Sequence, residues 1–388
     1  MAENINSKQD NSGEIDRWIR LIRADGVGPV TFGKLLKHFS TVDRALGASV
    51  SELAKVEGIG YKTAEQIARS RDTFDTEKEL AMAEKLGVWI VNLADSRYPA
   101  SLKQIYDPPP VLYVKGTLER SDNLAIGIVG SRRCSRYGAE QSSRFGYMLA
   151  SGGFTIISGM ARGIDSAAHR GAVRAKGRTI AVQGCGLGKV FPPENDKLCE
   201  VIAQSGACVS ELGLEIEPLA ENFPPRNRII AGLSMAVIVV EAAARSGALI
   251  TAKSAVDYNR EVMAVPGKID SPLSFGAHRL IKDGAKLVDS VDDVTEALGY
   301  IGHGIKEHVS TAAKDARKDV EAPLFDAAGL NLSENERAVY DCLDSEPVHI
   351  EDIIAQAGLG AGAINAGLIS LRLKGLIKQL PGNVFVKS

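Results

Sequence analysis

Between about residues 124 and 298, short aliphatic runs alternate with stretches of helical spacing, and this alternation constrains the fold more than any other feature of the sequence. The runs have the length and composition of buried strands. They are Ala125–Val129, Thr155–Ser158, Thr179–Gln183, Ala207–Ser210, Ala236–Glu241, Val262–Pro266 and Lys286–Val288. Strands and helices alternating at this spacing form βαβ units. The sequence therefore predicts an α/β domain over residues 124–300, with a mostly parallel sheet covered by helices on both faces.

The segments before this domain have different patterns. Residues 1–75 contain two glycine turns, Asp25–Pro29 and Val56–Gly60, that each open an amphipathic helix and resemble a helix-hairpin-helix module. Such turns either hold a DNA phosphate on backbone N–H groups or only pack a small helical domain, and both alternatives stay open. Residues 76–123 form a connecting segment that enters the sheet through a rigid proline run, Asp107–Pro110.

The segments after the sheet are a linker and a second small domain. Residues 301–325 are polar and without periodicity, as in a linker. In residues 326–388, the first helical pattern opens with Ser333 and Glu336, which form a capping-box pattern. The segment ends with two strands about a Pro-Gly-Asn turn. Three helical patterns and this terminal hairpin predict a winged-helix domain.

The third helix of the predicted winged helix is the one that would enter a DNA groove. Its early positions offer Asn365 as their strong hydrogen-bonding side chain, and the cations Arg372 and Lys374 lie at its far end. This arrangement favours protein contact or stabilisation over DNA reading.

Composition limits the location and the partners of the protein. The net charge is -2 and the pI is near 6.4, so the cations of a nucleic-acid site must be concentrated locally. The N-terminus has no apolar core, and the longest aliphatic stretch, Met235–Val240, is too short to span a bilayer. The five cysteines are scattered, which is typical of a reducing compartment, and the six histidines do not cluster. We expect a cytoplasmic protein with no membrane segment, metal or cofactor.

The turn after the first strand of the domain carries the clearest chemical signal. Gly130 and Ser131 leave backbone N–H groups free for an anion, and Arg132 and Arg133 follow directly. The dinucleotide fingerprint G-x-G-x-x-G and the Walker A pattern are absent, and no acidic residue ends the second strand. Guanidinium groups suit phosphate oxygens, so this turn is typical of a loop that binds the phosphates of a nucleic-acid backbone.

Further cations, small residues and one aromatic residue lie in the loops beside the other strands. They are Ser158, Gly159, Arg162, Lys189, Phe223, Arg226, Asn227, Arg228, Ser246 and Gly247. Because the carboxyl ends of parallel strands meet at one edge of the sheet, we expect these loops to converge on one crevice. Several arginines from separate loops fit a polyanion better than a mononucleotide.

Some of these residues have a structural alternative. Phe223 either stacks a base or plugs its loop with an apolar ring, and the spacing does not decide between the two. Arg162 and Arg228 bind phosphate or pair with Asp165 or Glu241 beneath the loops. His169 lies on a helix without an obvious base or nucleophile partner, so we expect a core or capping histidine rather than a catalytic one.

At these residues the sequence resembles the DNA-processing protein A (DprA/Smf) family over nearly the whole chain. The shared motifs are G-S-R-x-x-S-x-Y-G, S-G-x-A-R-G-I-D-x-x-A-H, F-P-x-R-N-R-I-I-A-G-L-S, S-G-x-L-I-T-A and A-V-P-G. The resemblance implies an extended Rossmann-like fold, binding of single-stranded DNA, homodimer formation and loading of RecA onto DNA during natural transformation. It carries DNA-binding roles over to Arg132, Phe223 and Arg226. Glu221 departs from the basic residue or histidine that many relatives have near this position, which should weaken phosphate binding.

Two other functions remain as alternatives. A nucleotide phosphoribohydrolase of the lysine-decarboxylase-like group would use the same kind of sheet, but its catalytic loop contains a carboxylate. The equivalent stretch here, Ala244–Ala252, has none. A pure scaffold acting through its helical modules would leave the loop arginines unexplained. The sequence thus favours a recombination mediator that is not an enzyme.

Overall fold

The structure, a computed structural model, describes residues 3–298 and, with gaps at 344–345, 361–362, 365–366, 369, 372–375 and 381–383, residues 332–387. The chain forms two compact units, Met1–Ala316 and Arg317–Ser388. The predicted linker, residues 301–325, lies outside the described residues, as do Asn365, Arg372 and Lys374. Within the described part, no helix is long and apolar enough to cross a membrane.

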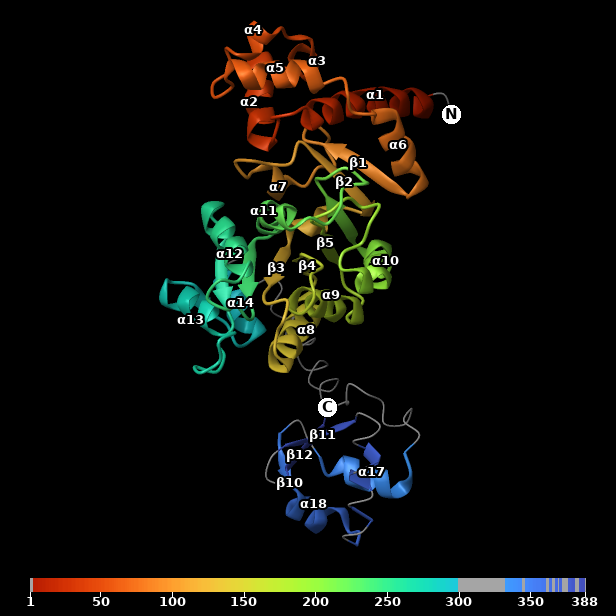
Figure 1. Ribbon diagram of the computed structural model, residues 1–388, viewed down its shortest axis with the longest axis vertical. Coiled ribbons are helices and arrows are strands. Elements are labelled where there is room, and N and C mark those ends of the chain that lie inside the picture. The colour runs from red at the N-terminus through yellow and green to blue at the C-terminus, as the bar shows by residue number, and fades with distance from the viewer. Residues whose placement is uncertain are drawn as a thin grey trace. The chain divides into compact units, whose positions relative to one another are not determined.

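The first unit is built on a nine-stranded sheet with the order β1-β2-β6-β5-β4-β3-β7-β8-β9 (Figure 1). Its strands are β1 (Val88–Asn92), β2 (Val111–Gly116), β3 (Ala125–Val129), β4 (Thr155–Ser158), β5 (Thr179–Val182), β6 (Ala207–Ser210), β7 (Ala236–Val239), β8 (Glu261–Ala264) and β9 (Lys286–Leu287). From β6 to β9 all neighbouring strands pair in parallel. The mostly parallel α/β fold predicted from the sequence is confirmed.

Two strands of this sheet come from the segment that we expected only to lead into it. β1 pairs with β2, and β2 pairs with β6, both antiparallel. The sheet therefore begins about 36 residues earlier than residue 124, since β1 starts at Val88. An antiparallel edge on an otherwise parallel sheet is common in large α/β folds.

Helices cover both faces of the sheet, and their apolar sides meet the central strands β3 to β7, which are buried at every position. One face packs against α8 (Arg136–Ser151), α9 (Ile164–Arg174), α10 (Asp196–Ser205) and α14 (Val291–Ala297). The other packs against α7 (Ala100–Lys103), α11 (Phe223–Leu233) and α12 (Ala248–Asp257). α13 (Phe275–Lys282) lies beside β8, and the 3-10 turns are η1 (Arg120–Asn123), η2 (Pro193–Asn195) and η3 (Ala220–Asn222). Burial on both faces explains why the strands read as continuous aliphatic runs.

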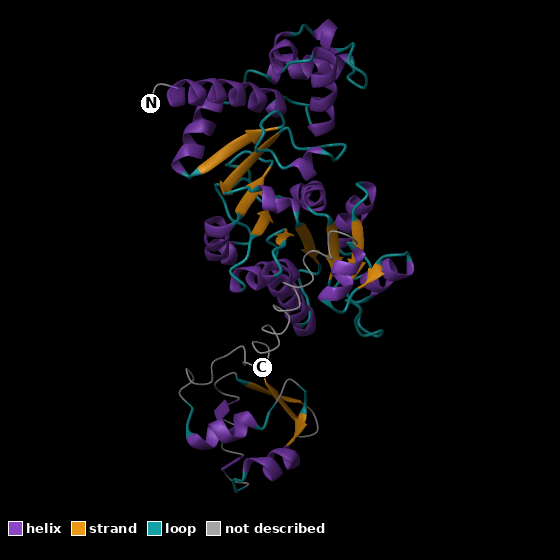
Figure 2. Ribbon diagram, turned by 180° about the vertical axis from the view of Figure 1, so that it is seen from behind, coloured by secondary structure: helices purple, strands orange, loops and turns teal. Residues whose placement is uncertain are grey.

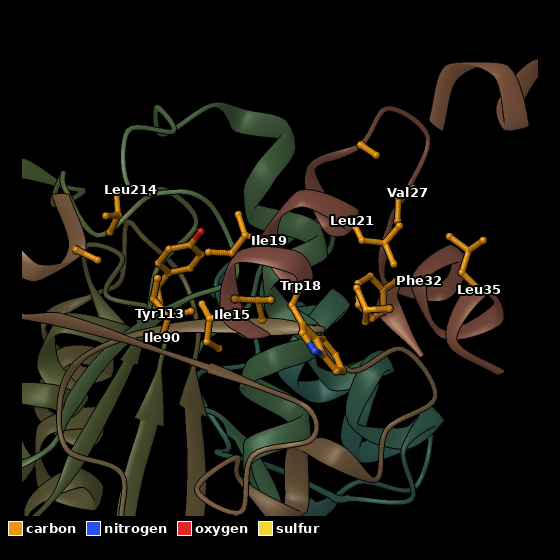
Figure 3. Packing of buried hydrophobic residues seen from close by; sticks show 14 of the residues in the cluster. Ile15, Trp18, Ile19, Leu21, Val27, Phe32, Leu35, Ile90, Tyr113 and Leu214 are labelled. Atoms are coloured by element: carbon orange, nitrogen blue, oxygen red, sulfur yellow. The ribbon is translucent and has the colours of Figure 1, made fainter. Parts of the chain in front are cut away.

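The N-terminal helices form the predicted pair of hairpins and share a core with the sheet edge (Figure 3). They are α1 (Glu3–Arg23), α2 (Pro29–Phe39), α3 (Val42–Gly47), α4 (Val50–Leu53), α5 (Tyr61–Ser70) and α6 (Thr76–Lys85). Gly26 and Gly58 have φ of 82° and 81°, the left-handed conformation that favours glycine in a tight turn. Trp18 packs on Phe32 with ring centroids 5.0 Å apart, and the same apolar cluster reaches Tyr113 of β2.

The second unit has the predicted winged-helix elements (Figure 2). They are α17 (Glu334–Asp341), β10 (Val348–His349), α18 (Ile350–Ala357), β11 (Ile377–Leu380) and β12 (Val384–Lys387). The Ser333 hydroxyl accepts the Glu336 N–H and the Glu336 carboxylate accepts the Ser333 N–H, so the capping box is confirmed. Ile353, Leu371 and Phe385 are buried in a core that belongs to this unit alone.

Candidate nucleic-acid binding crevice

A crevice lies at the carboxyl ends of β3 and β7, where the connections leave the sheet in opposite directions. From β3 the chain proceeds to β4 on one side, while β7 pairs with β3 on the other side. Diverging loops at such a switch point leave a space between them. Here the space has a volume of about 450 Å³, and its walls come from the loops after β3, β4 and β7 and from the start of α11. Its lining includes Gly130, Ser131, Arg132, Asp165, Phe223, Arg226, Asn227, Arg245, Ser246 and Gly247.

The turn after β3 is clamped between β7 and α9. Ser131 donates its N–H to the Glu241 carbonyl at 2.8 Å, and its own carbonyl accepts the Ile164 N–H at 3.3 Å. A Cβ on Gly130 would lie 2.6 Å from the Ile164 side chain and 2.8 Å from the Glu241 carbonyl oxygen. Glycine is therefore required at position 130 by close packing, and the direction in which Arg132 leaves the turn is fixed.

The buried side chain of Glu241 holds the start of α8. Its carboxylate accepts the Ser135 N–H at 2.8 Å and the Ser135 hydroxyl at 2.5 Å. The Ser135 hydroxyl oxygen in turn accepts the Gly138 N–H at 3.0 Å, so that Ser135 caps the helix. A Cβ on Gly138 would overlap the Glu241 carboxylate. The residue that follows β7 thus fixes the arginine turn that follows β3.

Arg132 and Phe223 form one unit at the mouth of the crevice. The exposed Arg132 guanidinium carbon lies 4.9 Å from the Phe223 ring centroid, which is a cation–π geometry. Phe223 is only 9% exposed, its ring lies 5.5 Å from the Phe191 ring, and a Cβ on Gly184 would touch it at 2.7 Å. The interpretation of Phe223 as a plug is thus favoured, because the guanidinium and not a free ring faces the opening.

A buried arginine and a buried carboxylic acid form the floor. Arg226 donates from Nη1 to the Gly159 carbonyl at 2.7 Å and to the Val182 carbonyl. Asp165 accepts the Gly159 N–H at 3.2 Å. Burial raises the pKa of Asp165 to about 6, although the Arg226 charge acts to lower it. Burial also lowers the pKa of Arg226 to about 10, so the guanidinium stays charged at neutral pH.

The remaining wall is the turn that starts α12. Asn227 donates from Nδ2 to the Gly247 carbonyl at 3.3 Å, and its Oδ1 accepts the Arg226 Nε–H at 3.2 Å. The Ser246 hydroxyl accepts the Ala248 N–H at 3.3 Å. These contacts join α11 to α12, and the predicted convergence of the two segments is found.

Other residues singled out from the sequence lie outside the lining of this cavity. Ser158 is buried and donates its hydroxyl to the Ile128 carbonyl at 2.6 Å. Gly159 lies beneath the floor, where its backbone bonds to Arg226 and Asp165. Lys189 pairs with Glu217 on the surface, and Arg133 is exposed next to Arg132.

The expected ion pairs of Arg162 and Arg228 need correction. The exposed Arg162 pairs with Glu194 rather than Asp165. The buried Arg228 pairs with Glu211 and with Asp107, whose carboxylate lies 3.4 Å from Arg228 Nε, rather than with Glu241. Both partners of Arg228 belong to segments outside the arginine loops. Arg228 therefore fastens α11 to the proline run at residue 107.

His169 is the core histidine that the sequence indicated. It is fully buried, and its Nδ1 lies 2.7 Å from the Thr179 hydroxyl. That hydroxyl donates to the Ile156 carbonyl, so its oxygen accepts a hydrogen bond from the Nδ1–H of His169. Burial lowers the pKa of His169 to about 3, and the ring is neutral at physiological pH.

Sequence reasoning missed two features of this region. Arg245 lines the crevice from the loop after β7, and its signal was the same as that of Arg132, a cation placed just after a strand. Cys199 and Cys208 lie with their sulfur atoms 2.7 Å apart. Nothing in their spacing indicated this contact, because it depends on α10 folding back on β6.

The fold and the site define a Rossmann-like α/β protein whose switch-point crevice carries arginines in place of a dinucleotide fingerprint. Residues 89–299 match the model of the DNA recombination-mediator protein A family. Residues 19–71 match a SAM-like helix-hairpin-helix tandem, and residues 322–383 match the DprA winged helix domain.

Individual relatives agree with the family models. The chain is 35% identical to Protein Smf of Synechocystis sp. over 387 residues, which cover 94% of this chain and 96% of the relative. It is 45% identical to the DNA processing protein DprA of Streptococcus pneumoniae over 203 residues, 52% of this chain and 72% of that one. The X-ray structure of the Streptococcus pneumoniae DprA superposes with a TM-score of 0.63 at 36% identity, covering 72% of this chain and 96% of the other. The chain belongs to the DNA recombination-mediator protein A (DprA/Smf) family.

Proposed function

We propose that this protein binds single-stranded DNA in the crevice between β3 and β7 and acts as a recombination mediator. The observation that carries the proposal is the cationic lining: Arg132 and Arg245 at the opening and Arg226 on the floor. Guanidinium groups bind phosphate oxygens with two parallel hydrogen bonds. Because Arg132 is exposed and has no ion pair among the described residues, it is available to a phosphate.

The size of the crevice supports a single strand over a duplex. A volume of about 450 Å³ suits one nucleotide-sized group. A base enters such a pocket only when it is outside a base-paired stack, and extracting it from a duplex costs a few kcal/mol. The Arg132 guanidinium, whose carbon lies 4.9 Å from the Phe223 ring centroid, is itself a planar group on which an unpaired base can stack.

The proposal includes two partners that the family resemblance implies. One is a RecA recombinase, onto which the bound strand would be loaded during natural transformation. The other is a second copy of this chain, in a homodimer. The DNA-binding step can be tested independently of both.

The test is a titration of labelled single-stranded DNA with the full chain at several salt concentrations. Arg132→Ala should weaken binding and lower the dependence of log affinity on log salt by about 0.7, the value for one phosphate contact on a single strand. Arg279→Ala, which removes an exposed arginine of α13 paired with Asp283, serves as the matched control. Duplex of the same length should bind more weakly. If Arg132→Ala leaves the affinity and the salt slope unchanged, the crevice does not bind the DNA and the proposal is wrong.

A further inference from the structure

Residues 131–176 carry a net positive charge, although the net charge of the whole chain is slightly negative. Residues 131–176 contain eight lysines and arginines and two acidic residues, whereas the whole chain has a net charge of -2. One of the two acidic residues, Asp165, is buried in the crevice. The remaining acid, Glu140, pairs with Arg136. The outer surface of this stretch is therefore strongly positive.

This stretch folds into two helices that present one continuous surface. α8 and α9 lie side by side on one face of the sheet (Figure 1). Gly146 of α8 packs against the Ala168 backbone, and Gly171 of α9 packs against the Ser143 backbone, each too closely for a Cβ. With the helix backbones this close, side chains on the outer faces of the two helices are neighbours.

Five of the cations on this surface have no acidic partner among the described residues; we call them the α8–α9 ridge. They are Arg133, Arg144, Arg170, Arg174 and Lys176. Arg174 lies over the Tyr147 ring at 5.1 Å, and Arg170 donates to the neutral amide oxygen of Asn195 at 3.4 Å. A solvated helix face normally mixes charges of both signs. The ridge does not, which points to an anionic ligand.

The ridge begins at the crevice and leads away from it. Arg133 directly follows Arg132, and α8 starts at the turn that lines the opening. α8 has 16 residues and is thus about 24 Å long. Lys176 follows the end of α9, at the far end of the ridge.

The opposite flank of the crevice has the reverse charge. Residues 211–221, which lead to Phe223, contain four glutamates and no lysine or arginine. Three of them are paired, Glu211 with Arg228, Glu215 with Lys78 and Glu217 with Lys189. The fourth, Glu221, is exposed beside the lining residue Ala220. A polyanion leaving the crevice on this side meets repulsion, and on the ridge side it meets attraction.

We propose that the α8–α9 ridge binds the sugar–phosphate backbone of the nucleic-acid strand where it extends out of the crevice. This inference rests on the proposed function of the crevice and deepens it by assigning the path of the strand. The contacts are to phosphates, so the ridge is insensitive to base sequence. Its contribution depends on the length of the strand, because a short strand does not reach it.

The experiment compares two lengths of labelled single-stranded DNA on the full chain. An oligonucleotide of about 5 nucleotides fills the crevice only, and one of about 20 also covers the ridge. The test variant is Arg170→Gln/Arg174→Gln. Its matched control is Lys85→Gln/Lys282→Gln, which removes two exposed cations from α6 and α13. Tryptophan fluorescence checks that each variant is folded.

For the long strand, the ridge variant should lower the salt slope by about 1.4, the value for two phosphate contacts on a single strand. The ratio of the unaltered protein's affinity to the variant's affinity should therefore be about 25-fold larger at about 0.1 M salt than at about 1 M. The ridge variant should bind the short strand with the affinity of the unaltered protein. The control variant should bind both strands with that affinity. If the ridge variant loses the same affinity for both lengths, or loses none for the long strand, the proposal that the ridge binds DNA is wrong. If Arg132→Ala weakens binding while the ridge variant does not, only the ridge fails. If neither variant affects either strand, the proposed function of the crevice fails as well.

Discussion

Removal of the Glu241 carboxylate should unfold the start of α8 and with it the turn that carries Arg132. Glu241 is 4% exposed and makes two hydrogen bonds to Ser135, one to the backbone N–H and one to the hydroxyl. Hydrogen bonds to a charged group contribute about 1.5–3 kcal/mol each. The negative charge also lies at a helix N-terminus, where it contributes about 0.3–1 kcal/mol more.

These terms set the expected size of the effect. Glu241→Ala leaves the Ser135 N–H without its partner and opens a small cavity, so we expect a loss of about 3–5 kcal/mol in the free energy of unfolding. Glu241→Gln keeps an oxygen acceptor for the N–H but loses the charge, and should cost about 1–2 kcal/mol. Gly138→Ala, whose methyl group would overlap the carboxylate, should approach the loss of Glu241→Ala.

Urea unfolding followed by tryptophan fluorescence measures these losses. The two tryptophans, Trp18 and Trp89, both belong to the Met1–Ala316 unit, so the signal reports on the unit that contains the crevice. Glu200→Gln, an exposed acid on α10, is the matched control and should stay within about 0.5 kcal/mol. A loss below about 1 kcal/mol in Glu241→Ala, with an unchanged urea slope, would refute the anchoring role that we assign to this carboxylate.

Two further predictions follow from the site and from the domain organisation. Because the pKa of Asp165 is raised to about 6, lowering the pH through 6 neutralises a carboxylate inside the crevice, and single-stranded DNA should bind more tightly at pH 5.5 than at 7.5. Fluorescence anisotropy across this range should show the rise in the unaltered protein and a flat profile in Asp165→Asn; equal profiles would exclude Asp165 as its source. By the same linkage, the raised pKa of Asp165 makes a stabilising contribution to the folded form that is fully present below pH about 4. This contribution is lost as the pH rises from about 4 to 6. A chain ending at Glu321 should remain folded by circular dichroism and bind single strands like the full chain, because the winged helix has a core of its own. A large loss of affinity in that folded truncation would show that the winged helix contacts the strand.

Much of the architecture could be predicted because it is encoded locally. Aliphatic runs such as Ala125–Val129 and Ala236–Glu241 indicated strands buried on both faces, and the helical stretches between them required parallel pairing. The rule that ligands lie at the carboxyl ends of such strands placed Arg132 and the loops containing Asn227 and Gly247 around one cavity, and the structure brings them together there.

Only the tertiary structure decided which side chains line the crevice and which are buried behind it. Arg226 and Arg228 are two residues apart on α11, yet Arg226 forms the floor of the crevice while Arg228 is buried against Asp107 and Glu211. Helical periodicity separates their directions but cannot identify the carboxylates they meet, since Asp107 lies 121 residues earlier in the chain. Glu241 reaches Ser135 for the same reason, because β3 and β7 are neighbours only in the folded sheet. Sequence patterns determine the elements, whereas contacts between distant loops depend on the order of the strands and on which side chains fit between them.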